Sequence, residues 1–255
     1  MKKFFERIKN ITMEKKMNLL IMFLLISCFI KNDSGIKDIT DSSNSQLKFE
    51  KKYENQLNNF VFLVKMITTP MESITYSTAS GTIISSTNSH IFVLTANHFC
   101  KSESEIIPFN PEILIWNQNN VRFGHVLYSD SENDICILTG IKYKKENFKN
   151  LKFADEMPTI GEFTFNVSAP NGMSSPEVKL MFDGYFAGCE KKSNICFYSI
   201  PSTYGSSGSS VYNKKGELIS IIVMANPEFE NVGLGPDIYI IKNSIKQLEK
   251  IMVIK

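Results

Sequence analysis

Residues 204–213 read Tyr-Gly-Ser-Ser-Gly-Ser-Ser-Val-Tyr-Asn, a cluster of glycine and serine that runs directly into an alternating apolar segment. Glycine adopts the positive φ values of tight turns without steric strain, so this stretch predicts a sharp loop that leads into a β-strand. Two earlier stretches also lie at the edges of strand-like runs: Leu-Thr-Ala-Asn-His at 94–98 and Asn-Asp-Ile-Cys-Ile-Leu at 133–138. The chain therefore presents a histidine, an aspartate and a serine, in that order, each beside a predicted strand.

The chain beyond residue 53 repeats this pattern of strand and turn. Apolar or alternating runs of about five to eight residues are separated by turn residues, which is typical of β-strands. The runs form two sets of six: 60–67, 80–85, 91–96, 113–116, 121–128 and 135–139, then 162–167, 178–186, 195–200, 209–212, 218–224 and 238–241. We therefore predict an all-β protein with two six-stranded antiparallel β-barrels, 53–141 and 153–255, joined by the lysine-rich segment 142–152.

The end of the chain has a different pattern. Ser244 is of a residue type that caps helix N-termini, and the apolar residues after it recur at helical spacing. These apolar residues are Ile245, Leu248, Ile251 and Met252. We predict a C-terminal helix that packs on the second barrel.

The first 52 residues are expected to lie outside the barrels. A basic segment precedes an uncharged apolar run at 19–30, which is shorter than a membrane span and typical of a secretory signal. Residues 1–30 are thus interpreted as a signal peptide or an N-terminal membrane anchor, and 31–52 as a polar tether. We expect the chain to be exported, and then either secreted or held at the cell envelope. Leu-Ile-Ser-Cys at 25–28 resembles the bacterial lipobox, which makes Cys28 a lipidation candidate beside those two alternatives.

Four further cysteines lie in the predicted barrels, and export would permit disulfides between them. Cys189 and Cys196 flank a polar turn between two strand-like runs, so we predict that they clip a hairpin. Cys100 and Cys136 could form a second pair. Free buried thiols are the alternative for all four, because cysteine is a common small core residue.

Composition excludes several other classes of function. The net charge is +2 and the basic residues are spread among acidic ones, so no basic stripe favours a nucleic-acid partner. The sequence has no zinc-like spacing of cysteine and histidine and no phosphate-binding loop. We expect neither a metal nor a cofactor.

The histidine, aspartate and serine supply the groups that peptide hydrolysis by a serine nucleophile requires. Ser207 is the candidate nucleophile, His98 the base, and Asp134 the carboxylate that holds the histidine in its useful tautomer. The amides of Gly205 and Ser207 can point together at an oxyanion, because glycines at 205 and 208 permit a tight turn. Asp130 is a weaker alternative to Asp134, since no apolar strand follows it directly, and His90 and His125 are expected to be structural or exposed.

These motifs resemble those of the chymotrypsin-like serine peptidases. Thr-Ala-Asn-His at 95–98 resembles their Thr-Ala-Ala-His, Asn-Asp-Ile at 133–135 resembles their Asp-Ile-Ala, and Gly-Ser-Ser-Gly-Ser at 205–209 resembles their Gly-Asp-Ser-Gly-Gly. The similarity is closest to the bacterial V8-like, or glutamyl endopeptidase, group, whose Gly-Asn-Ser-Gly-Ser-Pro-Val-Phe-Asn resembles 205–213. The resemblance covers about 60–250 and implies chymotrypsin-like barrels and an enzyme that cleaves proteins or peptides.

The sequence departs from these families at positions that set specificity and activation. Ser206 stands where animal trypsins have the aspartate that receives a newly cut N-terminus. Ile222 stands where glutamyl endopeptidases have a carboxylate-binding histidine, and Pro201 where trypsin has its pocket aspartate. Uncharged P1 residues are therefore expected in a substrate pocket formed by Ser202, Thr203, Ile222, Val223, Met224 and Ala225.

Two hypotheses for function follow from the sequence. The first is an exported serine endopeptidase. The alternative is a catalytically inactive, protease-like lipoprotein that acts as a binding or adhesion module. The complete set of histidine, aspartate and serine favours the enzyme, because a binding module does not need all three.

Overall fold

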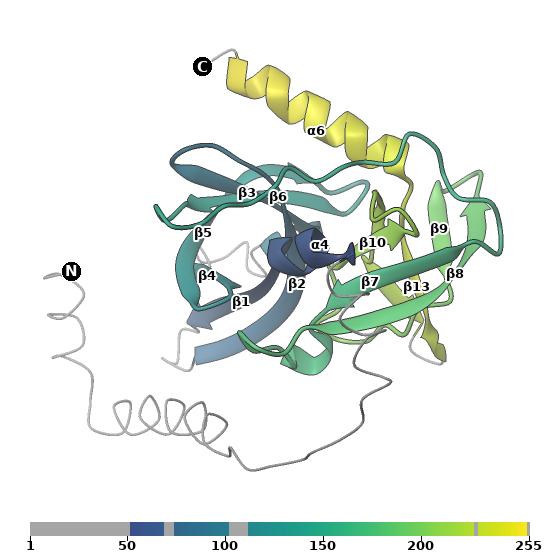
Figure 1. Cartoon of the computed structure of the whole chain (residues 1–255), viewed down its shortest axis with the longest axis horizontal. Coiled ribbons are helices and arrows are strands. Elements are labelled where there is room, and N and C mark those ends of the chain that lie inside the picture. Colours follow the sequence, from purple (N-terminus) through teal and green to yellow (C-terminus); the bar gives the residue numbers. More distant parts are fainter. Residues whose placement is uncertain (1–51, 69–73, 102–111, 227–228, 254–255) are drawn as a thin grey trace, which may run out of the picture. The chain divides into compact units, whose positions relative to one another are not determined.

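A computed structural model describes residues 52–68, 74–101, 112–226 and 229–253 of this protein (Figure 1). The chain divides into two units, 1–48 and 49–255, and all described residues belong to the second. The predicted signal peptide or anchor, most of the tether and the lipidation candidate Cys28 lie outside the described residues. No helix in the described part of the chain is long and apolar enough to cross a membrane.

The first half is a closed six-stranded antiparallel barrel, as the sequence predicts. Its strands pair in the order β1-β2-β3-β6-β5-β4. Its interior is mostly apolar and buried, with Val61, Leu63 and Ile83 among the residues that fill it, although Lys65 on β1 and Arg122 on β5 are buried as well. The strands are β1 (Phe60–Thr68), β2 (Ile74–Ser86), β3 (His90–Ala96), β4 (Glu112–Asn117), β5 (Asn120–Asp130) and β6 (Ile135–Ile141).

The second half is a seven-stranded sheet of order β11-β10-β7-β8-β9-β13-β12, where the sequence predicts a second barrel of six strands. The predicted strand 218–224 divides because the backbone changes partner within it. Ile222 N donates to Ser209 O at 2.8 Å, and Val223 N then donates to Leu234 O at 2.8 Å. The strands are β7 (Phe163–Ser168), β8 (Leu180–Glu190), β9 (Ile195–Tyr198), β10 (Ser210–Asn213), β11 (Leu218–Ile221), β12 (Met224–Asn226) and β13 (Phe229–Pro236). A turn of 3-10 helix, η1 (Pro170–Gly172), follows β7.

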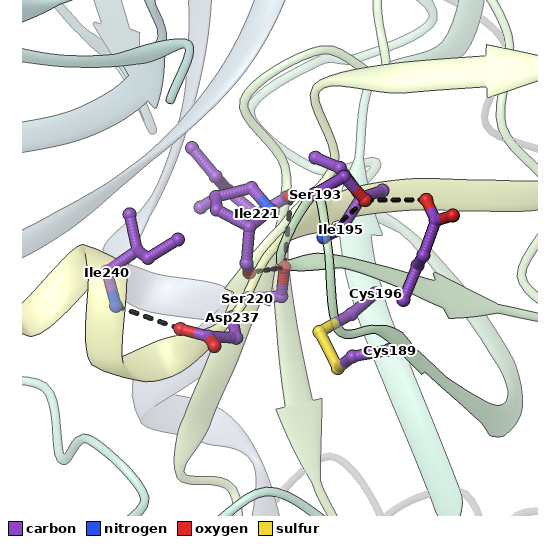
Figure 2. Close-up of a disulfide and its surroundings, with 10 residues drawn as sticks. Cys189, Ser193, Ile195, Cys196, Ser220, Ile221, Asp237 and Ile240 are labelled. Atoms are coloured by element: carbon purple, nitrogen blue, oxygen red, sulfur yellow. Dashed lines mark hydrogen bonds between the residues drawn. A yellow bond between two sulfur atoms is a disulfide. The ribbon is translucent and has the colours of Figure 1, made fainter. Parts of the chain in front are cut away.

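The C-terminal helix α6 (Ile238–Val253) begins earlier than predicted. Residues 238–241 form its first turn, so the prediction of a strand there is wrong. A short buried apolar run fits a strand and a buried helix equally well. Asp237 decides the outcome, because its Oδ1 accepts the Ile240 amide at 2.9 Å in the manner of a helix cap (Figure 2). Ser244, the predicted cap, lies inside the helix.

Helix α6 contacts both halves of the molecule rather than the second alone. It packs on β11 of the second half and on β5 of the first. Two side-chain hydrogen bonds join it to the first half, from Ser244 Oγ to Asp130 Oδ2 at 3.3 Å and from Tyr128 OH to Gln247 Oε1 at 2.9 Å. The helix therefore holds the two halves in contact.

A short helix that the sequence did not predict, α4 (Glu54–Asn59), also bridges the halves. Gln56 Nε2 donates to Gly216 O in the β10–β11 turn at 2.6 Å. Asn59 Nδ2 donates to Ile83 O on β2 at 2.7 Å. Both side chains are buried, so these bonds are shielded from water and fix the start of the domain against both sheets.

Two disulfides link the four cysteines of the domain. Cys189 and Cys196 join β8 to β9 across their hairpin, at the place that the sequence suggests (Figure 2). Cys100 and Cys136 join the segment after β3 to strand β6. The sequence did not decide whether this second disulfide forms, because the contact between the two cysteines depends on the closure of the barrel.

Candidate active site

His98 and Asp134 lie side by side at one end of the first barrel. The buried strand β3 ends in a single helical turn, α5 (Asn97–Cys100), that carries His98. His98 Nδ1 and Asp134 Oδ2 are 2.6 Å apart, and the other carboxylate oxygen accepts the His98 backbone amide, also at 2.6 Å. This pairing places the proton of a neutral imidazole on Nδ1 and leaves Nε2 as the acceptor. The His98 side chain is 48% exposed, so the ring remains accessible.

Asp130 shapes the loop that carries Asp134. In the sequence, Asp130 is the weaker candidate for the carboxylate that holds the histidine. The Asp130 carboxylate accepts the backbone amides of Glu132 and Asn133, both at 3.1 Å, and the Asn133 side chain at 2.8 Å. Although burial alone would raise its pKa, the hydrogen bonds from Asn133, Ser244 and Glu132 hold the pKa of Asp130 below its ordinary value. Asp130 therefore folds the turn, and in the part of the chain that the structure describes no hydrogen bond joins it to His98.

The disulfide between Cys100 and Cys136 lies next to this pair. Cys100 is in the same helical turn as His98, and Cys136 is two residues beyond Asp134 on β6. The disulfide therefore connects the two elements that carry the base and its carboxylate.

Ser207 lies in a tight loop between β9 and β10. At two positions of this loop the backbone has a conformation that only glycine adopts without strain. Gly205 and Gly208 have φ values of +85° and +81°, in the left-handed region. A Cβ on Gly205 would collide with the Ala169 carbonyl oxygen, and one on Gly208 would collide with the Thr95 hydroxyl. Both glycines are thus required by conformation and by space.

Backbone contacts attach the serine loop to the strands of the first half. Ser80 N on β2 donates to Ser207 O at 2.8 Å. Gly208 lies so close to the end of β3 that an added Cβ would be 2.9 Å from Ala96 N. The loop therefore reaches the strand end that carries His98. In the described part of the chain no hydrogen bond joins Ser207 to His98, and such contacts are often long in enzymes without substrate.

The amide of Gly205 is oriented by the carbonyl that precedes it. Tyr204 O accepts the Asn171 amide of η1 at 2.5 Å. In a trans peptide the N–H points opposite to the carbonyl, so this bond directs the Gly205 N–H away from η1. Within the described residues, the Gly205 amide donates to no protein acceptor.

The amide of Ser207 is oriented in the same way. The preceding carbonyl, Ser206 O, accepts the Ser209 amide at 3.0 Å, and the Ser207 amide has no acceptor among the residues that the structure describes. Two backbone donors of one loop are therefore held in place and unused. This is the arrangement that an oxyanion site requires.

The six predicted pocket residues differ in their burial. Ser202 and Ile222 are both buried and lie on either side of Gly233 on β13. A Cβ at Gly233 would be 2.6 Å from Ser202 Oγ and from Ile222 Cδ1, so the three residues pack closely and only glycine fits at this position. No local sequence signal marks Gly233, because its contacts are with residues distant in the sequence. Val223 belongs to the core between the halves, whereas Met224 is exposed. Thr203 and Ala225 are partly exposed, and none of these side chains is charged.

The other two histidines differ from His98 in their surroundings. His90 and His125 are exposed, and His90 Nδ1 is 2.9 Å from Ser89 Oγ. Among the described residues, no three His, Cys, Asp or Glu side chains group together as metal ligands would.

Comparisons with known proteins place these observations in a family. Residues 79–221, which include the histidine, aspartate and serine above, match the family model of the trypsin-like peptidase domain. No curated protein matches the sequence. Among solved structures, the chain is similar to the crystal structure of the serine endoprotease from Yersinia pestis, with a TM-score of 0.61 and 17% identity. The match covers 78% of this chain and 66% of that chain, and at such identity it shows the shared chymotrypsin-like fold.

Proposed function

Because the chain belongs to the trypsin-like peptidase family, we propose that it is a serine endopeptidase that hydrolyses peptide bonds through an acyl-enzyme. The observation that carries the proposal is the 2.6 Å hydrogen bond between His98 Nδ1 and Asp134 Oδ2. It leaves Nε2 of the imidazole as a proton acceptor beside a serine loop with two unused amides. The trypsin-like family and the groups gathered at this site thus both support an acyl-transfer reaction.

The reaction begins with Ser207. Its Oγ attacks the substrate carbonyl carbon while His98 Nε2 takes the hydroxyl proton, and Asp134 stabilises the resulting imidazolium. The carbonyl oxygen becomes an oxyanion that the amides of Gly205 and Ser207 bind. The C–N bond then breaks as His98 returns the proton to the leaving amine. A water molecule repeats the sequence on the ester, which releases the second product and restores Ser207.

An uncharged P1 residue suits the pocket best. The predicted pocket residues are uncharged, and two of them, Ser202 with its hydroxyl and Ile222 with its aliphatic side chain, are in close contact with Gly233. A charged P1 group buried there would have no ionic partner, which costs several kcal/mol. This preference would separate the protein from glutamyl endopeptidases, although the resemblance of its serine motif to that of the V8-like group supports a relationship with them.

Export is the second part of the proposal. The basic segment and the apolar run at 19–30 support a signal peptide or membrane anchor, with Cys28 as the lipidation candidate. The two disulfides of the domain also favour an oxidising compartment. Proteins or peptides outside the cytoplasm are then the substrates.

A fluorophosphonate probe tests the enzyme against the alternative of an inactive binding module. The probe should label the wild-type protein at Ser207, and Ser207→Ala should abolish labelling. Ser193→Ala, in the exposed turn of the β8–β9 hairpin, is the control and should label like wild type. A folded wild-type protein that takes up no probe would support the binding module instead.

A further inference from the structure

The hydroxyl and the backbone amide of Ser80 on β2 connect the two halves at the serine loop, and its carbonyl binds within the first half. Its hydroxyl donates to Gly205 O at 2.8 Å and accepts the Ala169 amide at 2.9 Å. Its backbone amide donates to Ser207 O at 2.8 Å, and its carbonyl accepts the Thr95 hydroxyl at 2.8 Å. The residue is fully buried. No motif in the sequence identifies Ser80 as a functional residue.

The direction of the Ser80 hydroxyl proton is determined by these contacts. A serine hydroxyl has a single hydrogen to donate. The Ala169 amide must be the donor in its bond to Ser80 Oγ, because a backbone N–H cannot accept. The Ser80 proton is therefore available for the Gly205 carbonyl alone, which makes the contact a directed hydrogen bond between the halves.

The Gly205 carbonyl belongs to the peptide that lies between the two oxyanion donors. The N–H of that peptide, on Ser206, donates to Thr203 O at 3.0 Å. Its carbonyl is held by Ser80. Since Gly205 has no side chain to restrict rotation, the orientation of this peptide depends on those two bonds. Together with the bonds of Tyr204 O and Ser206 O, its orientation determines the angle between the Gly205 and Ser207 amides.

In trypsins an ion pair at the residue before the serine stabilises this loop, as the resemblance described above implies. Here that position is Ser206, which has no charge and is buried. A different contact must hold the loop in its binding conformation. Ser80 provides one from the opposite half of the molecule.

We propose that Ser80 is a positioning residue for oxyanion binding, and that it orients the Gly205–Ser206 peptide from across the junction between the halves. The inference rests on the proposed function, since it assigns a role within the same site. The oxyanion site is then complete only when the first barrel and the serine loop are in contact.

The test compares Ser80→Ala with Thr82→Val in the full domain. Thr82 lies on the same strand, is equally buried, and its Oγ1 is 3.5 Å from Tyr212 OH in the second half. Its loss removes a similar buried hydroxyl without touching the serine loop. For Ser80→Ala we expect kcat on a peptide substrate to fall about 10- to 100-fold, less than the loss of a direct oxyanion donor. KM should change less than about threefold, because ground-state binding does not need the oxyanion site.

Affinity for a peptide boronate provides the second measurement. A boronate forms a tetrahedral adduct with Ser207, so Ser80→Ala should weaken it by about the same factor as kcat, whereas Thr82→Val should not. If Ser80→Ala does not fold, Ser80→Cys keeps the volume with a weaker donor and should show a smaller loss of the same kind. Unchanged kcat and boronate affinity in a folded Ser80 variant, with Ser207→Ala inactive, would overturn this inference alone. Failure of wild type to react with the fluorophosphonate would instead overturn the proposed function.

Discussion

The two halves of the molecule contribute different kinds of group to the candidate site. The first half is a closed barrel with an apolar interior, and it contributes the side chains of His98 and Asp134. The second half is a sheet with buried polar residues on β7, and apart from Ser207 Oγ it contributes backbone amides. The base therefore requires a rigid pair of side chains, whereas the nucleophile requires a particular loop conformation.

Removing the reactive side chain from each half should have the largest effect. Ser207→Ala and His98→Ala should each lower kcat by about 10⁶-fold, and the double variant should lose little more, because the two act as a unit. Single-turnover kinetics with a peptide ester would measure this. Losses that multiply in the double variant would show that the halves act independently.

Asp134→Asn should have the next largest effect, about 10⁴-fold in kcat. The amide can hold the ring but favours the wrong tautomer of His98, so geometry is preserved while the base is lost. Asp130→Asn is the matched control on the same loop. We expect it to lower the free energy of unfolding, and to lower kcat far less than Asp134→Asn does. A larger loss of kcat for Asp130→Asn would mean that the carboxylate role is misassigned.

The two disulfides allow the halves to be compared in stability. Their cysteines are 36 and 7 residues apart in the sequence. In the loop-entropy model these spans correspond to about 4 kcal/mol for Cys100–Cys136 and about 2 kcal/mol for Cys189–Cys196. Paired Cys→Ser variants, unfolded in urea, measure both values.

Only the first disulfide should also affect catalysis, because it joins the elements that carry His98 and Asp134. We expect the Cys100→Ser, Cys136→Ser variant to lose activity at temperatures where it is still folded. Equal activity losses in the two double variants would contradict a specific role for Cys100–Cys136.

Buried and exposed ion pairs give a difference in stability that depends on pH. Arg122 and Glu146 form a buried pair that anchors the segment after the first barrel, whereas Lys214 and Glu162 form an exposed pair in the second half. Glu146→Gln should lower the free energy of unfolding by about 3 kcal/mol at neutral pH. Glu162→Gln should have no measurable effect, because exposed pairs contribute little.

The sign of the pH dependence follows from the pKa of Glu146. Burial alone would raise this pKa, but hydrogen bonds from Arg122, Tyr143 and Asn120 hold it below the ordinary value of 4.5. The stabilisation is therefore complete above about pH 4.5 and is lost as the pH falls through the lower folded pKa. Urea unfolding between pH 3 and 7 should show a shallower acid decline for Glu146→Gln than for wild type. A decline of equal slope would rule out this contribution.

The sequence by itself determined the features that depend on local pattern. Alternating apolar runs predicted every strand of the first barrel, because one face of each strand must be buried. The glycine and serine cluster predicted the tight loop at Ser207, and turn residues between Cys189 and Cys196 predicted the hairpin that they join.

Only the tertiary structure decided features that depend on partners distant in the sequence. Residues 238–241 are helical because Asp237 caps them, although the same apolar run fits a strand. The contacts of Ser80 with Gly205 and Ala169 appear only when the two halves meet, and the close packing of Gly233 against Ser202 and Ile222 appears only when the second half folds. Hydrogen bonds and steric contacts act through space, so residues with no local signature acquire their roles from the fold.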